Sequence, residues 1–321
     1  MPENPNRRQF LRRSLIAATG ATAAMSFEER HLLAQQVDKE MAGTSRKVVS
    51  LLKDLRGKVP TGKIGNLEIS RLILGGNLIG GWAHARDLIY VSKLVQAYHT
   101  KEKIWETYAL AEACGINTHL TNPKLIDVIN EYWKRGLGKI QFISDCGGSD
   151  LMIGIKRSID NGACSCYIHG SIADKLARTG QWDTFATALD LIRKNGLPAG
   201  IGGHYLNTVK GCADRGIVPD YWMKTFHPLD YWSARHPEPK GVYCRKPEDT
   251  IAFMESRKEP WIAFKTMAAG ALHPKRAFPY AFENGADFIC VGMFDFQIVE
   301  DVKIACGLLS GDLKRSRRWC G

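Results

Sequence analysis

The stretch GADFICVGMFDFQIVEDVKIACGLL, residues 285–309, decides the fold. Its first part, ADFICVGM, is a short and nearly continuous apolar run, which predicts a strand buried on both faces. Its second part, FQIVEDVKIACGLL, predicts a helix that mixes apolar with charged positions. A buried strand followed directly by a helix is the unit from which folds with a parallel sheet are built.

The same unit recurs along the chain. Eight near-continuous apolar runs predict strands at residues 71–76, 115–120, 139–148, 163–170, 197–204, 218–228, 260–267 and 286–293. The predicted helices follow them at residues 100–115, 123–136, 151–162, 180–196, 205–216, 247–259, 275–285 and 296–309. A hairpin, with strands at 63–65 and 67–70, precedes the first unit. Eight units in strict alternation predict a (β/α)8 TIM barrel over residues 61–312, with a doubly wound open sheet as the alternative.

The composition is that of an ordinary globular protein. The 321 residues are 45% hydrophobic and 24% charged, and a barrel of this kind occupies one domain. The formal net charge of +11 is concentrated at the two ends of the chain. No basic helix is interleaved with aromatic residues, so the sequence favours a solvated basic tail at 313–321 over a nucleic-acid partner. Nine cysteines cannot all pair within one chain, and we expect mostly buried free thiols.

Residues 1–26 resemble a twin-arginine export signal. Paired arginines at 7–8 precede Phe10 and Leu11, and a mildly apolar run ends in the candidate cleavage region ATAAM. The signal predicts the twin-arginine export machinery as a partner and a periplasmic or otherwise extracytoplasmic location; a basic amphipathic helix is the alternative. The run is too short to span a bilayer, so no stable membrane span is expected. Residues 27–60 predict a helical extension.

Polar side chains occupy the predicted carboxyl ends of the strands, where active sites lie in this fold. In chain order these residues are Asn77, His119, Asp145, His169, His204, His227, Lys265 and Asp295. Converging neutral imidazoles with a carboxylate suit Zn, Mn, Fe or Ni, with open positions for water or substrate. The sequence therefore predicts a divalent-metal site held by His119, His204 and His227. It predicts that the catalytic residues are His169, Lys265 and Asp145.

Aromatic and polar side chains near these strand ends predict a substrate platform. They are Trp82, which follows the first strand, and the group Asp230, Tyr231 and Trp232 within HPLDYW. Such a platform suits a small polar molecule, with a sugar among the candidates. Lys265 is suited to act as a general base or to hold a substrate anion. Each residue also has a structural reading, as a hydrogen-bonded strand-end histidine, a buried ion pair or loop packing.

Over roughly residues 62–310 the chain resembles the aldo-keto reductase family. The resemblance is carried by the hairpin, ISRLILGGN, GIN at the second strand, NGLPAGIGGH, PWIAFKTMAAGAL and GADFICVGMFDFQIVEDVKIA. It implies a TIM barrel plugged by the N-terminal hairpin and carbonyl reduction with NAD(P) as the cofactor. At the phosphate end, Phe294 and Asp295 stand where a basic residue would help to hold the 2′-phosphate of NADPH.

The catalytic positions of that family are largely replaced here. The resemblance places the family's Asp on Leu120, its Tyr on Leu125 and its Lys on Cys146 or the neighbouring Asp145, and retains only the His, as His169. Leucine cannot donate a proton, so the proton donor of ordinary carbonyl reduction is absent from its usual place.

Three functions follow, in order of preference. The first is an exported enzyme whose strand-end histidines form a metal or proton-transfer site, acting as a hydrolase, lyase or isomerase. The second is an NAD(P)H-dependent oxidoreductase with a rearranged active site. The third is a non-catalytic binding protein on a decayed barrel.

Overall fold

A computed structural model describes residues 52, 55, 57–85, 88–235 and 244–321. The predicted export signal and nearly all of the predicted helical extension lie outside these residues. Within the described ranges, no helix is both long enough and apolar enough to cross a membrane.

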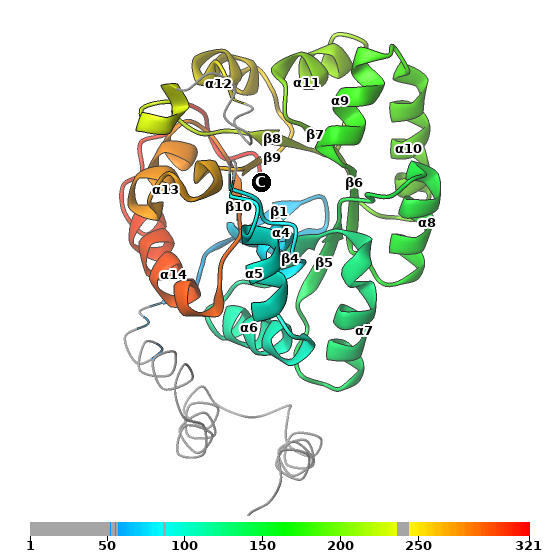
Figure 1. Cartoon of the computed structure of the whole chain (residues 1–321). Coiled ribbons are helices and arrows are strands. Elements are labelled where there is room, and N and C mark those ends of the chain that lie inside the picture. Colours follow the sequence, from blue (N-terminus) through cyan, green and yellow to red (C-terminus); the bar gives the residue numbers. More distant parts are fainter. Residues whose placement is uncertain (1–51, 53–54, 56, 86–87, 236–243) are drawn as a thin grey trace, which may run out of the picture.

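Eight parallel strands close into a barrel in the order β10-β3-β4-β5-β6-β7-β8-β9 (Figure 1). Their bounds are β3 Leu72–Gly75, β4 Thr118–Thr121, β5 Gln141–Ser144, β6 Ser165–Ile168, β7 Ala199–Gly203, β8 Tyr221–Thr225, β9 Trp261–Phe264 and β10 Phe288–Val291. The last strand pairs with the first, with Ile289 opposite Leu72. The predicted TIM barrel is therefore confirmed, and the open sheet is wrong.

Helices surround the barrel. Those that match predicted helices are α6 Lys101–Ala113, α7 Ile126–Lys134, α8 Leu151–Asp160, α10 Trp182–Lys194, α11 Leu206–Ala213, α12 Pro247–Glu255, α13 Pro274–Glu283 and α14 Asp295–Leu309. Three more were not predicted, namely α4 Gly76–Ile79, α5 Val91–Tyr98 and α9 Gly170–Arg178. Short 3-10 turns lie at Pro123–Leu125, Trp232–Arg235 and Ala268–Gly270. Of the added helices, α9 shapes the site because it begins directly where β6 ends.

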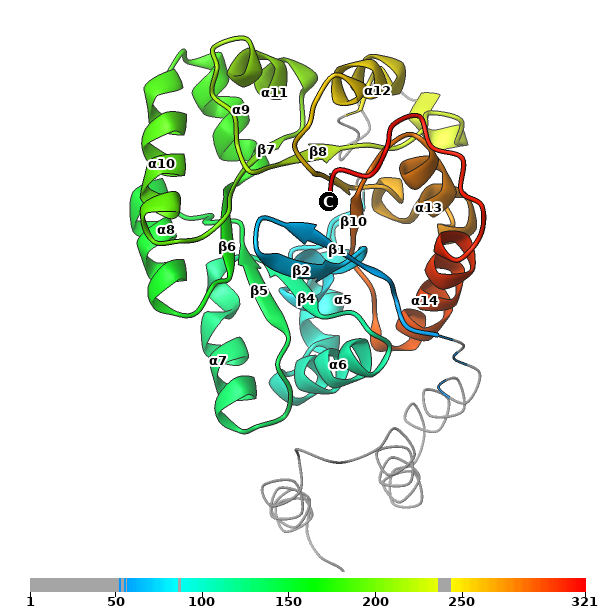
Figure 2. The ribbon, with the colours of Figure 1, turned by 180° about the vertical axis from the view of Figure 1, so that it is seen from behind.

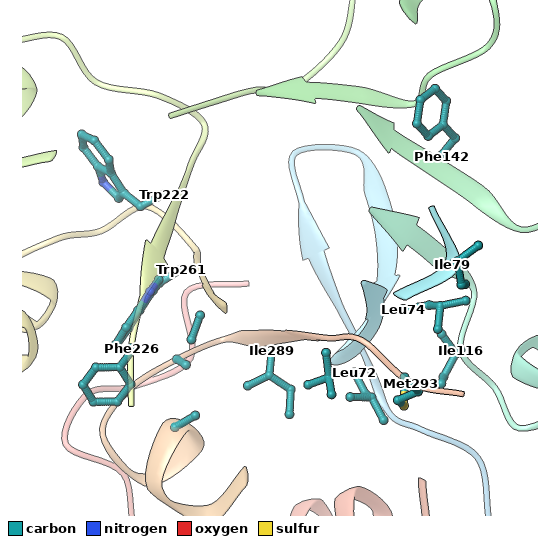
Figure 3. Packing of buried hydrophobic residues seen from close by; sticks show 14 of the residues in the cluster. Leu72, Leu74, Ile79, Ile116, Phe142, Trp222, Phe226, Trp261, Ile289 and Met293 are labelled. Carbon is teal, nitrogen blue, oxygen red and sulfur yellow. The ribbon is translucent and has the colours of Figure 1, made fainter. Parts of the chain in front are cut away.

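Side chains of successive strand residues alternate between two hydrophobic clusters, as the pleat of a strand requires. The cluster inside the barrel comprises Ile64, Ile69, Ile73, Leu120, Ile143, Tyr167, Tyr221, Met223, Ile262 and Phe288. The larger cluster packs the outer strand faces against the helices and includes Leu72, Leu74, Phe142, Trp222 and Trp261 (Figure 3). A strand side chain thus points either into the barrel or toward a helix.

The amino-terminal end of the barrel is closed by the hairpin β1 (Thr61–Ile64) and β2 (Leu67–Ser70) (Figure 2). The carboxyl-terminal tail packs beside it. The centroid of the Trp319 ring lies 3.7 Å from the guanidinium carbon of Arg71 and 3.4 Å from that of Arg315. Arg317 lies 3.1 Å from the buried carboxylate of Asp287. Lys314 and Arg318 of the tail are exposed, as expected for a solvated basic tail, whereas Arg315 and Arg317 are partly or fully buried and hold the tail against the barrel.

One buried carboxyl in α14 lacks full hydrogen bonding. Asp301 is 3% exposed, and its Oδ2 has no hydrogen-bond partner in the described part of the chain. Burial, and next the charge of Glu300, raise the pKa of Asp301 to about 7. A pKa above that of the unfolded chain means that the folded state loses stability as the pH rises from about 4 to about 7.

The variant Asp301→Asn should therefore raise the free energy of unfolding by about 2 kcal/mol at pH 8 and change it little at pH 4. Urea unfolding at the two pH values measures the difference. An equal rise in the free energy of unfolding at pH 4 and at pH 8 would show that burial of the Asp301 charge is not the cause.

Candidate functional site

The carboxyl ends of the strands form the mouth of the barrel, with α4 and α5 in front of it in Figure 1. The ladder pairs Gly203 with Lys224 and Thr225 with Phe264. The residues that follow β7, β8 and β9 therefore emerge side by side. These are His204, His227 and Lys265.

His204 is held by a buried carboxylate. Its Nδ1 lies 2.8 Å from Oδ2 of Asp174, on α9, and its backbone N–H donates to the same oxygen at 3.2 Å. The other carboxylate oxygen accepts from Thr208 Oγ1 at 2.6 Å and from the Tyr205 N–H at 3.5 Å. A carboxylate can only accept, so Nδ1 of His204 carries the proton and Nε2 keeps its lone pair when the ring is neutral. Burial lowers the pKa of His204, although Asp174 opposes that effect.

The ring of His204 packs against the first residue of α9. A Cβ added to Gly170 would stand 2.9 Å from Cε1 of His204, closer than side chains normally approach. Glycine at this place therefore lets the helix and the imidazole meet.

His169 is oriented in the opposite way. It caps α9, and its Nδ1 accepts the backbone N–H of Ser171 at 3.3 Å and lies 2.7 Å from Ser171 Oγ. An Nδ1 that accepts an N–H cannot carry a proton, so the neutral ring carries its proton on Nε2. The centroids of the His169 and His204 rings are 6.2 Å apart. The mouth thus contains the ring of His169, which can donate a proton from Nε2, beside the ring of His204, whose Nε2 can accept a proton.

Asp145 lies near His169. Its Oδ1 accepts from Asn122 Nδ2 at 2.9 Å and from the Gly147 N–H at 2.7 Å. Burial raises the pKa of Asp145, and the charge of His169 opposes this. The structure therefore brings together two of the predicted catalytic residues.

Lys265 is the third. It directly follows Phe264, whose ring centroid is 5.4 Å from that of His204. Its φ of 57° is left-handed, a costly conformation for a residue with a side chain and one often found at functional sites. Burial lowers the pKa of Lys265 to about 8. Its charge lowers the pKa of His84, His204 and His227, so four basic groups share this side of the mouth.

A second lysine lies beneath the mouth. Lys224 is 1% exposed, and its Nζ donates to the carbonyl oxygens of His204 at 2.9 Å and Thr225 at 2.7 Å. Burial lowers the pKa of Lys224 to about 8 as well. Neither Lys224 nor Asp174 was recognised from the sequence. For Lys224, the signal in the sequence was a charged residue within an otherwise apolar strand. For Asp174, it was a short amphipathic stretch directly after His169.

The expectation that His119 faces the mouth is wrong. Strand β4 runs on to Thr121, so His119 is an internal strand residue, and it is Leu120 whose side chain fills the barrel. His119 points outward to α6, where its Nδ1 lies 2.9 Å from the hydroxyl of Tyr108. Burial lowers the pKa of His119 to about 3, which fits a neutral structural residue.

The predicted ligands therefore do not form a three-histidine metal site. His119 is on the other face of the sheet, and Nδ1 of His227 lies 3.0 Å from the carbonyl oxygen of Pro228. His227 is fully buried, and burial lowers its pKa to about 4. Across the described ranges, no three His, Cys, Asp or Glu side chains are grouped to hold a metal ion.

The predicted substrate platform is spread out. Trp82 packs partly buried against the outer cluster, and Asp230 forms a surface ion pair with Arg276. Tyr231 is buried, with its ring centroid 6.0 Å from that of His227. The side chain of Trp232 lies outside the described part of the structure. Substrate binding by these residues stays a prediction.

The two remaining strand-end residues lie in the first turns of helices. Asn77 is exposed in α4. Asp295 is buried at the start of α14, where it accepts from Tyr98 at 2.6 Å and from Lys103 at 3.2 Å.

Comparisons with known proteins agree with this fold. No protein-family model matches the chain, and no curated protein matches it. Among solved structures, two described as "putative aldo-keto reductase" from Pseudomonas aeruginosa match with TM-scores of 0.55 and 0.56. Their identities are 17% and 16%, over 81% and 80% of this chain and 99% of each of theirs. A truncated 3-deoxy-D-arabino-heptulosonate 7-phosphate synthase from Thermotoga maritima matches at 12% identity over 83% of this chain and 100% of its own, with a TM-score of 0.46. The resemblance to aldo-keto reductases is thus confirmed at the level of the fold.

Replacing the carboxylate that holds His204 tests this geometry. In Asp174→Asn we expect a further fall in the pKa of His204, because Asp174 raises it, and a loss of about 2 kcal/mol of folding stability. A histidine NMR titration and urea unfolding measure the two effects. Asp190→Asn, at an exposed position of α10, is the matched control and should change neither. An unchanged pKa of His204 in Asp174→Asn would contradict the assigned hydrogen bond.

Proposed function

We propose that this protein is an enzyme that transfers a proton on the carbon next to a carbonyl group of a small polar substrate, as an isomerase or lyase does. The observation that carries the proposal is the pair of imidazoles with opposite tautomers. His204 offers a lone pair on Nε2, and His169 offers a proton on Nε2, with the ring centroids 6.2 Å apart.

In this reaction Nε2 of His204 removes the proton from the carbon next to the carbonyl. Asp174, bound to Nδ1, stabilises the imidazolium that forms. Nε2–H of His169 donates to the carbonyl oxygen as negative charge develops on it, and the nearby positive charge of Lys265 supports that charge. Because His204 and Asp174 are buried, the electrostatic effects of this pair are stronger than in water.

The alternative is an NAD(P)H-dependent reductase with a rearranged site. It is supported by the barrel and by His169, which stands where the related reductases keep their histidine. Against it, the two leucines at the positions of the family's Asp and Tyr are buried and have no proton to donate. Tight NADPH binding with a change in nicotinamide fluorescence, but no proton exchange, would favour this alternative.

Proton exchange tests the proposal directly. Small hydroxy-aldehydes and hydroxy-ketones, including three- to six-carbon sugars, would be incubated with the protein in D2O and followed by NMR. We expect deuterium at the carbon next to one carbonyl, at a rate reduced at least 100-fold in His204→Asn and in His169→Asn. His273→Asn is the matched control, because His273 only caps α13 and asparagine is also a good cap. A rate that survives both active-site substitutions would contradict the proposal.

The pH dependence of exchange gives a second test. Because burial lowers the pKa of His204, the ring stays neutral and able to accept a proton down to pH values below about 6.5. We therefore expect kcat/KM to stay constant between pH 7.5 and 6.5 and to fall only at lower pH, where His204 becomes protonated. In Asp174→Asn the fall should begin at a still lower pH. If the fall in kcat/KM of Asp174→Asn instead began at a higher pH, this would contradict the role proposed for the pair of His204 and Asp174.

A further inference from the structure

We propose that Lys265 forms a covalent imine with the carbonyl carbon of the substrate. The inference rests on the proposed function and assigns to that site a substrate with an aldehyde or ketone group. It goes beyond electrostatic support, because it makes Lys265 a nucleophile that is attached to the substrate during proton transfer.

The position of Lys265 supports this role. It leaves the end of β9 with left-handed backbone, and the preceding Phe264 packs against His204, the proposed base. His84, from the segment after β3, and His227, from the segment after β8, also lie within reach of its charge. Lys265 therefore emerges at the mouth, where its charge reaches histidines from three other segments.

The protonation state supports it as well. With a pKa of about 8, roughly one in ten Lys265 side chains carries an uncharged amine at pH 7. For an ordinary lysine the fraction is roughly one in 2500. The nucleophilic form is thus a few hundred times more abundant.

The chemistry balances without a redox partner. The lone pair of Nζ forms the C–N bond as the C=O π pair moves to oxygen, which takes a proton from Nε2–H of His169. The nitrogen loses a proton to His204, which passes it to solvent and becomes neutral again, and His169 regains its ring proton from solvent. The product is a neutral carbinolamine. The hydroxyl then leaves as water with a further proton, delivered through His169 from solvent, and the nitrogen lone pair forms the C=N bond. Removal of the neighbouring C–H proton by the neutral His204 gives the enamine. Return of a proton to carbon restores the imine, and its hydrolysis regenerates the amine.

The chain provides its own comparison in Lys224. Its pKa is also lowered to about 8, yet it is 1% exposed and its Nζ donates to two carbonyl oxygens. If a lowered pKa alone decided reactivity, both lysines would react with a carbonyl compound. If access from the mouth of the barrel is also required, only Lys265 would react.

The test is reductive trapping on the full chain. The protein is incubated in turn with glyceraldehyde and with pyruvate, sodium borohydride is added, and the product is analysed by intact mass and peptide mapping. We expect about one adduct per chain with at least one probe, on Lys265 and not on Lys224, with a yield that rises between pH 6 and 8. Lys265→Met should lose the adduct, and Lys275→Met, at an exposed position, should keep it.

Absence of an adduct on Lys265 with both probes overturns the inference, as does labelling of exposed lysines at the same rate. The peptide map of the unsubstituted chain decides this even if Lys265→Met does not fold. Deuterium exchange without an adduct on Lys265 would sink the imine and leave the proposed function standing. A specific adduct without exchange on any substrate would support the imine and sink the proton-transfer function.

Discussion

The carboxylate of Asp174 is the group on which the arrangement at the barrel mouth depends. A buried charge is costly unless it is hydrogen-bonded, and this one accepts from His204, Tyr205 and Thr208. The same bonds tie α9 to the residues that follow β7. They fix which nitrogen of His204 carries the proton, and so which nitrogen is a base. The chemistry proposed for the mouth follows from that one choice of tautomer.

The second constraint is the alternation of side chains along short parallel strands. In β4, Leu120 points into the barrel, so His119 must point to the helices. Moving a strand boundary by one residue exchanges the two faces. This is why the barrel itself could be predicted from eight repeated units, whereas the direction of a single side chain near a strand end could not.

The candidate site was predictable only in part for the same reason. His169, His204, Lys265 and Asp145 follow the ends of buried strands, a position readable from the sequence, and the structure places them at one mouth. Asp174 is on a helix that the sequence did not reveal, because α9 occupies a short interval between β6 and α10. Lys224 looked like an ordinary strand residue. Its role depends on the carbonyl oxygen of His204, which comes within reach only when β7 and β8 lie side by side. Long-range partners of this kind are set by the closed barrel and leave no local pattern.

The resemblance of the fold to that of aldo-keto reductases also has a physical meaning. A barrel fixes where strand ends converge but not which side chains stand there, so fold and chemistry can diverge. Here Leu120 and Leu125 are buried where the resemblance places an acid and a proton donor. His169 keeps its place but lies beside a second imidazole, and that pairing suits proton transfer within a substrate.

The protonation of these two rings is the most direct test. Long-range 1H–15N correlation NMR on protein with 15N-labelled histidine, at pH 7.5, reports which ring nitrogen carries the proton. The hydrogen bonds of the two rings predict a proton on Nδ1 of His204 and on Nε2 of His169. The same tautomer in both rings, or a proton on Nε2 of His204, would leave the site without its base and contradict the proposed proton transfer.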